Sequence, residues 1–552
     1  MSNKLLTVLF LIALALALAD DHYRSFSRKG DQQETRYLKA QYVQYGPDFT
    51  EEQILFLARR QARATETRNG RLGVIEPGKK GLITIRKNQD MRVVKACIAA
   101  LRERGADLDY IYTTDLLELY GYPGEYAKPA LAIDTVKQPE LQLAISGIQH
   151  YHFKKSHFSE AAWKQLPAKA DELIAESQKR HDIKNKILLD YLNKHREYEY
   201  IYPEWFGGGP MVKEMGDLFG RRFQFGWRLD TLSRLVREGT LPNEVWRALE
   251  QKVLEVVPWI RHARITDPEG TDVEFSITPE DAKYWRMGVY NLDYLRMWPV
   301  QASRLLFLNS GIKHVVAPEA KGVIAGTDGH YHAMFPHLKL TIEGGQAVKA
   351  EGGGLQGVLM NDLIHKFKDY QIPYLPHPGW AVVFHLALTV NPKAADRTMY
   401  WAFGPELYIP EIEAYGKKHN IPITHDFHLN NGFITYEVTV TGGKKLKIKD
   451  GGHLVALDDP EVRAIASKFG DPEDILGEEG QRPIPGINAP GDYWKDYAQD
   501  PARYILAQRE SLRSRKSPYL TTIMPFQLRN IAGAQTDDGS IAAPQPADGP
   551  RD

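Results

Sequence analysis

The segment from Gly326 to His337, GTDGHYHAMFPH, places three histidines and one aspartate within twelve residues. His330 and His332 are separated by one residue, so on an extended strand both rings leave the same face. Two neutral imidazole nitrogens on one face can share a metal ion. An isolated pair of this kind is more often a surface or hydrogen-bonded pair, so the rest of the chain must decide. His337 is expected to be a pocket-wall or loop residue.

Three further histidines and two carboxylates complete the set of candidate site residues. His385 lies in the apolar run VVFHLAL, where a buried imidazole needs either a hydrogen bond or a metal. His425 and His428 are three residues apart, which places them on one side of a turn, and we expect one of them to be a ligand, His428 in preference. Asp426 is expected as a ligand and Glu437 as general base or second ligand, with surface ion pairing as the alternative for each.

Composition and charge restrict the class of protein. A chain of 552 residues that is 43% hydrophobic is long enough for two or three domains, each with its own core. The 70 basic and 70 acidic residues cancel, and no long run of either sign occurs. Nucleic acid is therefore not an expected partner, whereas a small molecule or peptide is.

The N-terminus has the pattern of a secretory signal. One lysine precedes an apolar run from Leu5 to about Leu16, and Ala17-Leu18-Ala19 forms a small-residue cleavage site before Asp20. The run is short for a membrane span, although an uncleaved anchor is the alternative. Cys97 is the only cysteine, so no intrachain disulfide can form. We expect a periplasmic or secreted protein without stable membrane insertion after cleavage.

The elements that must position these residues begin with an α/β segment. Leu82 to Ile85 reads as a strand, Asp90 to Arg104 as an amphipathic helix ended by Gly105, and Leu108 to Tyr112 as a second strand. The order strand, helix, strand predicts a right-handed βαβ unit. The segment contains neither G-x-G-x-x-G nor a Walker loop, so a nucleotide-binding role has no support.

Strands and glycine-rich turns dominate after about residue 260. Two strands are expected to join at Gly344-Gly345, a helix to follow from about Gly357, and two more strands to flank Asn430 to Gly432. The stretch beyond 460 is proline-rich and acidic, and its tail has the composition of disorder. The sequence leaves open whether this stretch covers the site or forms an independent extension.

The predicted fold class is α/β, with an N-terminal α/β domain that holds the βαβ unit and a C-terminal β-rich α+β domain that holds a metal site. We divide the chain into a signal peptide, an N-terminal domain with a helical insertion, the metal-site domain, and a C-terminal extension with a disordered tail: residues 1–19, 20–260, 261–460 and 461–552.

Four motifs in order resemble those of the aminopeptidase T type metallopeptidases: RITDPEGTDVEFSI, LTIEGGQAVKAEGGG, LALTVNPKAADR and HDFHLNNGF. The resemblance covers about residues 75 to 115 weakly and about 260 to 455 better. It implies a homodimer with two divalent metals, such as zinc, cobalt or manganese, held by glutamates, histidines and an aspartate, with a further glutamate as general base.

The chain departs from that pattern in its ligands. His385 stands where the family has a glutamate before its Asn-Pro segment, and DGHYH stands where another glutamate follows the central strand. Imidazoles in place of carboxylates disfavour two bridged hard cations and favour one borderline metal such as iron or zinc. The dihydroxypyridine ring-opening dioxygenase, of similar architecture, holds one iron(II) with histidines and an aspartate. The corresponding set here would be drawn from His330, His332, His385, Asp426 and His428.

Three functions follow from these patterns. The first is an exported, metal-dependent, aminopeptidase-like hydrolase that cleaves a peptide or amide bond with metal-activated water. The second is a mononuclear non-haem iron ring-opening dioxygenase. The third is an inactive binding relative that kept the fold and lost its metals. Export favours the hydrolase, whereas the histidine enrichment favours the iron enzyme.

Overall fold

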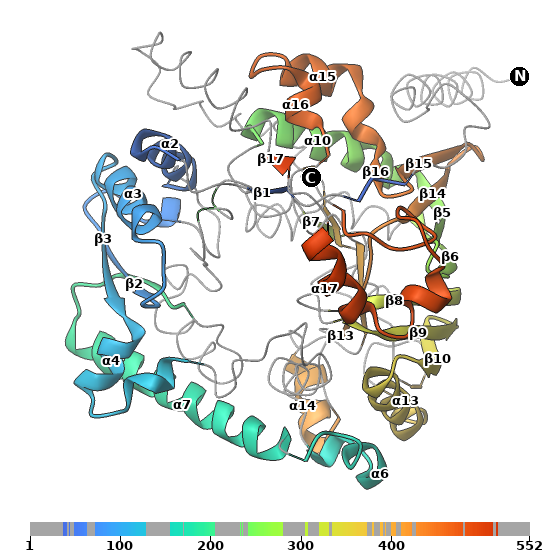
Figure 1. Ribbon diagram of the computed structural model, residues 1–552, viewed down its shortest axis with the longest axis horizontal. Helices are drawn as coiled ribbons and strands as arrows, with labels where there is room; N and C mark the ends of the chain where they lie inside the picture. The colour runs from blue at the N-terminus through green and yellow to red at the C-terminus, as the bar shows by residue number, and fades with distance from the viewer. Residues whose placement is uncertain are drawn as a thin grey trace, which may run out of the picture.

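The computed structural model contains a small parallel sheet and a large antiparallel sheet, which together make an α/β protein as predicted (Figure 1). The residues that the structure describes are 37–40, 43–44, 49–62, 72–128, 155–168, 170–204, 232, 235, 241–279, 304–306, 320–329, 334–371, 378–379, 387–389, 392, 399–403, 410–421, 427–478, 481–511 and 515–516.

The parallel sheet has three strands, with β2 (Lys80–Ile85) in the centre. β3 (Asp107–Tyr112) pairs with one of its edges and β4 (Tyr200–Tyr202) with the other. Helix α3 (Met91–Arg102) links β2 to β3, and Gly105, at φ +74°, turns the chain back toward the sheet. The predicted βαβ unit is therefore confirmed.

Helices cover both faces of this sheet. On one face, α4 (Thr113–Leu119) and α7 (Ala170–Lys194) close a small core with β2 and β4, formed by Leu82, Leu116, Leu117, Ile187, Leu188, Leu192 and Ile201. On the other face, α3 packs with α2 (Glu51–Ala62) in the main core. Burial of these apolar side chains fixes how the helices lie on the sheet.

The large sheet has twelve strands, in the order β16-β15-β14-β5-β6-β8-β13-β12-β11-β7, with β9 paired to β8 and to β10. Its strands are β5 (Ile260–Thr266), β6 (Asp272–Ser276), β7 (Arg304–Leu306), β8 (Lys321–Gly329), β9 (Met334–Glu343), β10 (Gln346–Gly352), β11 (Ala387–Thr389), β12 (Met399–Phe403), β13 (Phe427–Asn431), β14 (Thr435–Val440), β15 (Lys445–Asp450) and β16 (His453–Leu454). Every pairing in it is antiparallel.

The hairpin predicted at Gly344-Gly345 is confirmed as β9 and β10, and α13 (Leu355–Phe367) begins close to the predicted Gly357. Gly357 is required there because a Cβ would lie 1.8 Å from the carbonyl oxygen of Gly352. The two strands predicted around Asn430 to Gly432 are β13 and β14, which are not neighbours: β13 pairs with β8 and β12, and β14 with β5 and β15.

The remaining elements are shorter or lie around the sheets. The further helices are α6 (Glu160–Trp163), α10 (Asn243–Val256), α14 (Pro410–His419), α15 (Pro460–Ala466), α16 (Pro472–Leu476), a π-helix (Tyr493–Tyr497) and α17 (Pro501–Ser511). Single 3-10 turns occur at Leu72–Val74, Gly124–Ala127, Lys155–His157, Val257–Trp259 and Val455–Asp458, and β1 (Val43–Gln44) pairs with β17 (Arg515–Lys516).

The parallel sheet lies within the predicted N-terminal domain, and the large sheet begins at Ile260, beside the predicted boundary at 261. The boundaries themselves stay predictions. Over the described part of the chain, no helix combines the length and the apolar character that a membrane span needs.

Candidate functional site

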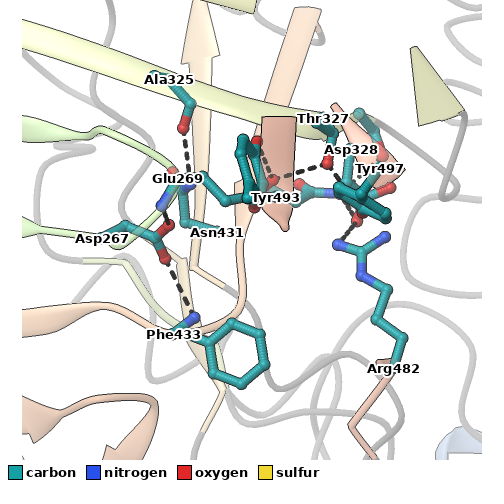
Figure 2. Close-up of polar contacts among 12 residues, drawn as sticks. Asp267, Glu269, Ala325, Thr327, Asp328, Asn431, Phe433, Arg482, Tyr493 and Tyr497 are labelled. Atoms are coloured by element: carbon teal, nitrogen blue, oxygen red, sulfur yellow. Dashed lines mark hydrogen bonds and ion pairs between the residues drawn. The ribbon is translucent and has the colours of Figure 1, made fainter. Parts of the chain in front are cut away.

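The turn between β5 and β6 carries two buried carboxylates, Asp267 and Glu269. Asp267 Oδ1 accepts the Glu269 backbone N–H at 2.8 Å, and its Oδ2 accepts the Phe433 N–H at 3.1 Å (Figure 2). The Asp267 N–H in turn donates to the carbonyl of Thr271 at 2.9 Å. Asp267 therefore shapes the turn and ties it to the chain between β13 and β14.

A second set of hydrogen bonds ties this turn to the middle of the large sheet. Thr271 Oγ1 donates to the carbonyl of Ala325 in β8 at 2.9 Å and accepts the Ala325 N–H at the same distance. Asn431 Nδ2, from β13, donates to the same carbonyl at 2.8 Å. The turn, β8 and β13 thus meet at one polar point inside the protein.

Glu269 is the most unusual carboxyl group of the site. Its Oε1 accepts hydrogen bonds from Thr327 Oγ1 at 2.7 Å and from the Tyr493 hydroxyl at 3.0 Å. Its Oε2 is buried and has no hydrogen-bond partner among the described residues. Burial, and then the charge of Asp267, raise the pKa of Glu269 well above its usual range, whereas Arg482 opposes the rise.

Asp328, at the end of β8, is fully buried (0% exposed) and forms an ion pair with Arg482 at 2.9 Å. Asn430 Nδ2 also donates to Asp328 Oδ2, at 3.3 Å, and to the Gly329 carbonyl at 2.6 Å. Burial works against the charge of Arg482, but Asp328, Tyr497 and Glu269 together raise the pKa of the guanidinium above its ordinary value.

The segment after residue 480 supplies essential parts of this network. The π-helix begins at Tyr493. The side chain of Asp492 caps it by accepting hydrogen bonds from the backbone N–H groups of Trp494 and Lys495. It directs the Tyr493 hydroxyl to Glu269, and the Tyr497 hydroxyl lies 3.0 Å from Thr327 Oγ1. Single-turn π-helices are common at functional sites. Arg482, Tyr493 and Tyr497, which all lie beyond residue 460, complete this buried network.

His337 closes one side of the same network. Its Nε2–H donates to the Glu269 carbonyl oxygen at 2.8 Å, since a carbonyl can only accept. The ring packs edge-on against Trp494, with centroids 4.7 Å apart, and against Tyr493 at 5.9 Å. Burial lowers the pKa of His337. His337 was expected to be a pocket-wall or loop residue; it lies on strand β9 and not in a loop, and its role as a pocket wall stays a prediction.

Most of the predicted site residues lie outside the described residues: His330, His332, His385, His425 and Asp426. His428 lies on β13, where its backbone is opposite Ala402 of β12. Glu437 lies on β14, opposite Arg264 of β5, with a side chain 32% exposed and an ion pair to Lys445 at 2.9 Å.

The described carboxylates do not form a metal site. Within the described ranges, no group of three or more His, Cys, Asp or Glu side chains is arranged to hold an ion. Asp267 and Glu269 accept hydrogen bonds from N–H and O–H donors, and Asp328 pairs with a guanidinium. These three carboxylates thus belong to a buried network of hydrogen bonds and one ion pair.

Sequence reasoning did not identify Asp267, Glu269, Arg482 and Tyr493 as site residues. The sequence does carry a signal for Asp267 and Glu269. They lie two residues apart in a turn with Pro268 and Gly270, between two apolar strands. Two carboxylates in such a turn can both be buried only if hydrogen-bond donors reach them. No comparable signal marks Arg482 or Tyr493, whose partners lie far away in the sequence.

Comparison with known proteins gives only distant likenesses. Neither a protein-family model nor a curated protein sequence matches the chain. The structure is similar to that of 2,5-dihydroxypyridine dioxygenase from Pseudomonas putida KT2440, with a TM-score of 0.36, 10% identity, and coverage of 75% of this chain and 99% of the other. It is also similar to wild-type AmpT from Thermus thermophilus, with a TM-score of 0.34, 12% identity and coverage of 73% and 99%. Because both TM-scores are below 0.5, the functional argument rests on the side chains of the site.

Proposed function

We propose that the protein is an exported, metal-dependent hydrolase that cleaves a peptide or amide bond in a small-molecule or peptide substrate. The observation that carries the proposal is the carboxyl group of Glu269, which is buried in a turn beside the ends of β8 and β13. Four of the predicted histidine ligands, His330, His332, His425 and His428, lie within or close to those same strands in the sequence.

Glu269 has the properties of a proton carrier. Its raised pKa lets the carboxyl group hold a proton near neutral pH, as a general acid needs when an amine leaves. Thr327 and Tyr493 fix the orientation of the group through Oε1, so Oε2 is the oxygen from which a proton can be exchanged.

Metal dependence rests on the histidine pattern of the sequence. Leu429 of β13 pairs with Gly329 of β8, and His330 follows Gly329 directly in the chain. Asp426 directly precedes β13. The two candidate segments therefore continue from strands that are hydrogen-bonded to each other. Zinc, cobalt or manganese would suit hydrolysis, and iron(II) would suit the ring-opening alternative.

Metal analysis and a paired substitution test this proposal. Protein purified without chelator should contain zinc, cobalt or manganese and hydrolyse members of an aminoacyl-p-nitroanilide panel. Glu269→Gln should lower kcat by about 100-fold, the usual contribution of a general acid or base, with unchanged metal content. Glu437→Gln, at the carboxylate predicted from the sequence, shows which of the two groups moves the proton.

Three other results would contradict the proposal. One equivalent of iron with oxygen consumption on a dihydroxypyridine would assign the ring-opening reaction. Absence of any bound metal and of any turnover would indicate a binding protein. Full activity of both Glu269→Gln and Glu437→Gln would remove the proton-carrier argument, whatever metal is present.

A further inference from the structure

Residues 492–500, which we name the site cover, lie against the Glu269 network and contain the π-helix. In the described part of the chain, no residue of the cover belongs to a strand or to an isolated strand bridge. Three hydrogen bonds join the cover to the large sheet and its turn: the Tyr493 hydroxyl to Glu269 Oε1 at 3.0 Å, the Tyr497 hydroxyl to Thr327 Oγ1 at 3.0 Å, and the His337 N–H to the Ala498 carbonyl at 2.7 Å (Figure 2).

The cover is held together by hydrogen bonds of its own. Asp492 Oδ1 accepts the Trp494 N–H at 3.0 Å, and the Asp492 N–H donates to Asp496 Oδ2 at 2.7 Å. The Ala498 N–H donates to the Tyr493 carbonyl at 2.8 Å and closes the π-turn. Because both partners of each bond lie within the cover, the segment can move as one body and keep these bonds.

The chain just before the cover is fixed, and a glycine separates the two parts. Asn488 Nδ2 donates to the carbonyl of Leu38 at 2.9 Å and to that of Arg482 at 3.0 Å, which ties this base to a distant part of the chain. Gly491 follows at φ +131°, and a Cβ there would lie 2.7 Å from Pro485 Cβ. Glycine changes its φ at a lower cost than other residues, so Gly491 is suited to act as a hinge.

The burial of Glu269 requires such a motion. Its side chain is 1% exposed, so a substrate can exchange a proton with it only after a neighbouring segment has moved. Strands β5, β6 and β8 are fixed by their antiparallel ladders, and their separation would break many backbone hydrogen bonds. The cover is bound more weakly. Tyr497, its buried side chain, packs in a small satellite cluster and not in the main core.

We propose that the site cover is a lid that swings about Gly491 and opens the way to Glu269, while the base around Asn488 stays in place. Lids are drawn from the less stable parts of a fold, and they admit substrate and then exclude water. The purpose of the opening rests on the proposed function, but the opening itself needs neither metal nor turnover.

Trp494 allows the opening to be altered without a change at Glu269. Its ring packs against His337 of β9, with centroids 4.7 Å apart, although the side chain is 58% exposed. Trp494→Ala removes this contact and should increase the open population by about two- to tenfold, the usual contribution of an aromatic pair. Trp259→Ala is the matched control, because Trp259 is also partly exposed (36%) and precedes β5 at the end opposite the Glu269 turn.

Carboxyl labelling of the full-length protein measures access to Glu269. A water-soluble carbodiimide with glycine ethyl ester is used, and the labelled positions are found by peptide mass spectrometry. Asp272, which is 53% exposed, should react quickly, Glu269 slowly, and Asp328, whose partner Arg482 belongs to the base, more slowly still. In Trp494→Ala, labelling of Glu269 and hydrogen exchange at the His337 amide should rise by the same factor, because both need the cover to open. Labelling of Asp328 should not change, and Trp259→Ala should behave as the unmodified protein.

Three results would overturn the lid. Labelling of Glu269 and Asp328 at one common rate would mean that both become accessible only when the whole domain unfolds. Absence of Glu269 labelling in every variant would mean that no opening occurs. Equal rates in Trp494→Ala and the unmodified protein would show that the cover does not control access. Trp494→Phe, which keeps an aromatic ring against His337, should return both rates toward those of the unmodified protein. A protein that meets these expectations but hydrolyses no substrate would lose the proposed function and keep the lid.

Discussion

The ion pair between Asp328 and Arg482 gives the sharpest test of the site. Arg482→Met keeps much of the side-chain volume and removes the cation that lies 2.9 Å from a carboxylate with 0% exposure. Removal of one partner of a buried ion pair costs about 3–5 kcal/mol, because the remaining charge stays in a low-dielectric interior. Arg482 is itself 17% exposed, so water can reach part of the gap, and we expect about 3 kcal/mol.

Arg264→Met is the matched control. Arg264 also pairs with an aspartate, Asp272, through two contacts of 2.9 and 2.8 Å, but both side chains are more than half exposed. Exposed pairs contribute about 0–1 kcal/mol because water and salt screen them. The two variants therefore remove the same kind of group from the same kind of partner and differ in burial.

Urea denaturation, followed by circular dichroism, measures both losses. The double variant Asp328→Asn/Arg482→Met should recover part of the stability that Arg482→Met loses, since no buried charge remains. A loss below about 1 kcal/mol for Arg482→Met, equal to that of Arg264→Met, would show that Asp328 is not buried as a carboxylate and would refute the reasoning.

Four further outcomes are expected. Asp458 and Glu478 raise the pKa of His453 from 6.5 to about 9 against the opposing effect of burial. The protonated ring therefore stabilises the fold fully below about pH 6.5, and this stabilisation is lost as the pH rises through about 9. Over that window the free energy of unfolding should fall by up to about 3 kcal/mol, and this fall should be absent in His453→Gln. Tyr493→Phe removes a donor that lowers the pKa of Glu269, so the limb of the pH–activity profile due to Glu269 should move to higher pH. Gly357→Ala drives a Cβ into a backbone carbonyl 1.8 Å away and should destabilise the fold by about 2 kcal/mol or more in thermal denaturation. If the signal peptide is cleaved as proposed, N-terminal sequencing should start at or near Asp20, and an intact Met1 on membrane-bound material would contradict the cleavage.

Local patterns predicted the elements of the fold well. Strand β2, helix α3 and strand β3 follow from apolar periodicity, and the turn at Gly344-Gly345 from two consecutive glycines, because these signals act over a few residues. The order of strands in the large sheet was not predictable, since β14 leaves its chain neighbour β13 to pair with β5 and β15.

The candidate site was less accessible to sequence reasoning for a physical reason. The donors that hold the buried Glu269 carboxyl group come from distant parts of the sequence: Thr327 lies 58 residues later and Tyr493 lies 224 residues later. The periodic pattern of apolar residues along the sequence does not reveal contacts between residues so far apart. The histidine pattern that pointed to a metal is local, and its residues other than His428 fall outside the described chain.

The position of Arg482 also sets the order in which the protein can mature. Asp328 is synthesised 154 residues before its cation. At about 5–20 residues per second, the ribosome needs roughly 8 to 30 s to add that stretch. During this interval Asp328 lacks the cation with which it pairs in the folded protein, so we expect the end of β8 to reach its final packing only after Arg482 has been synthesised.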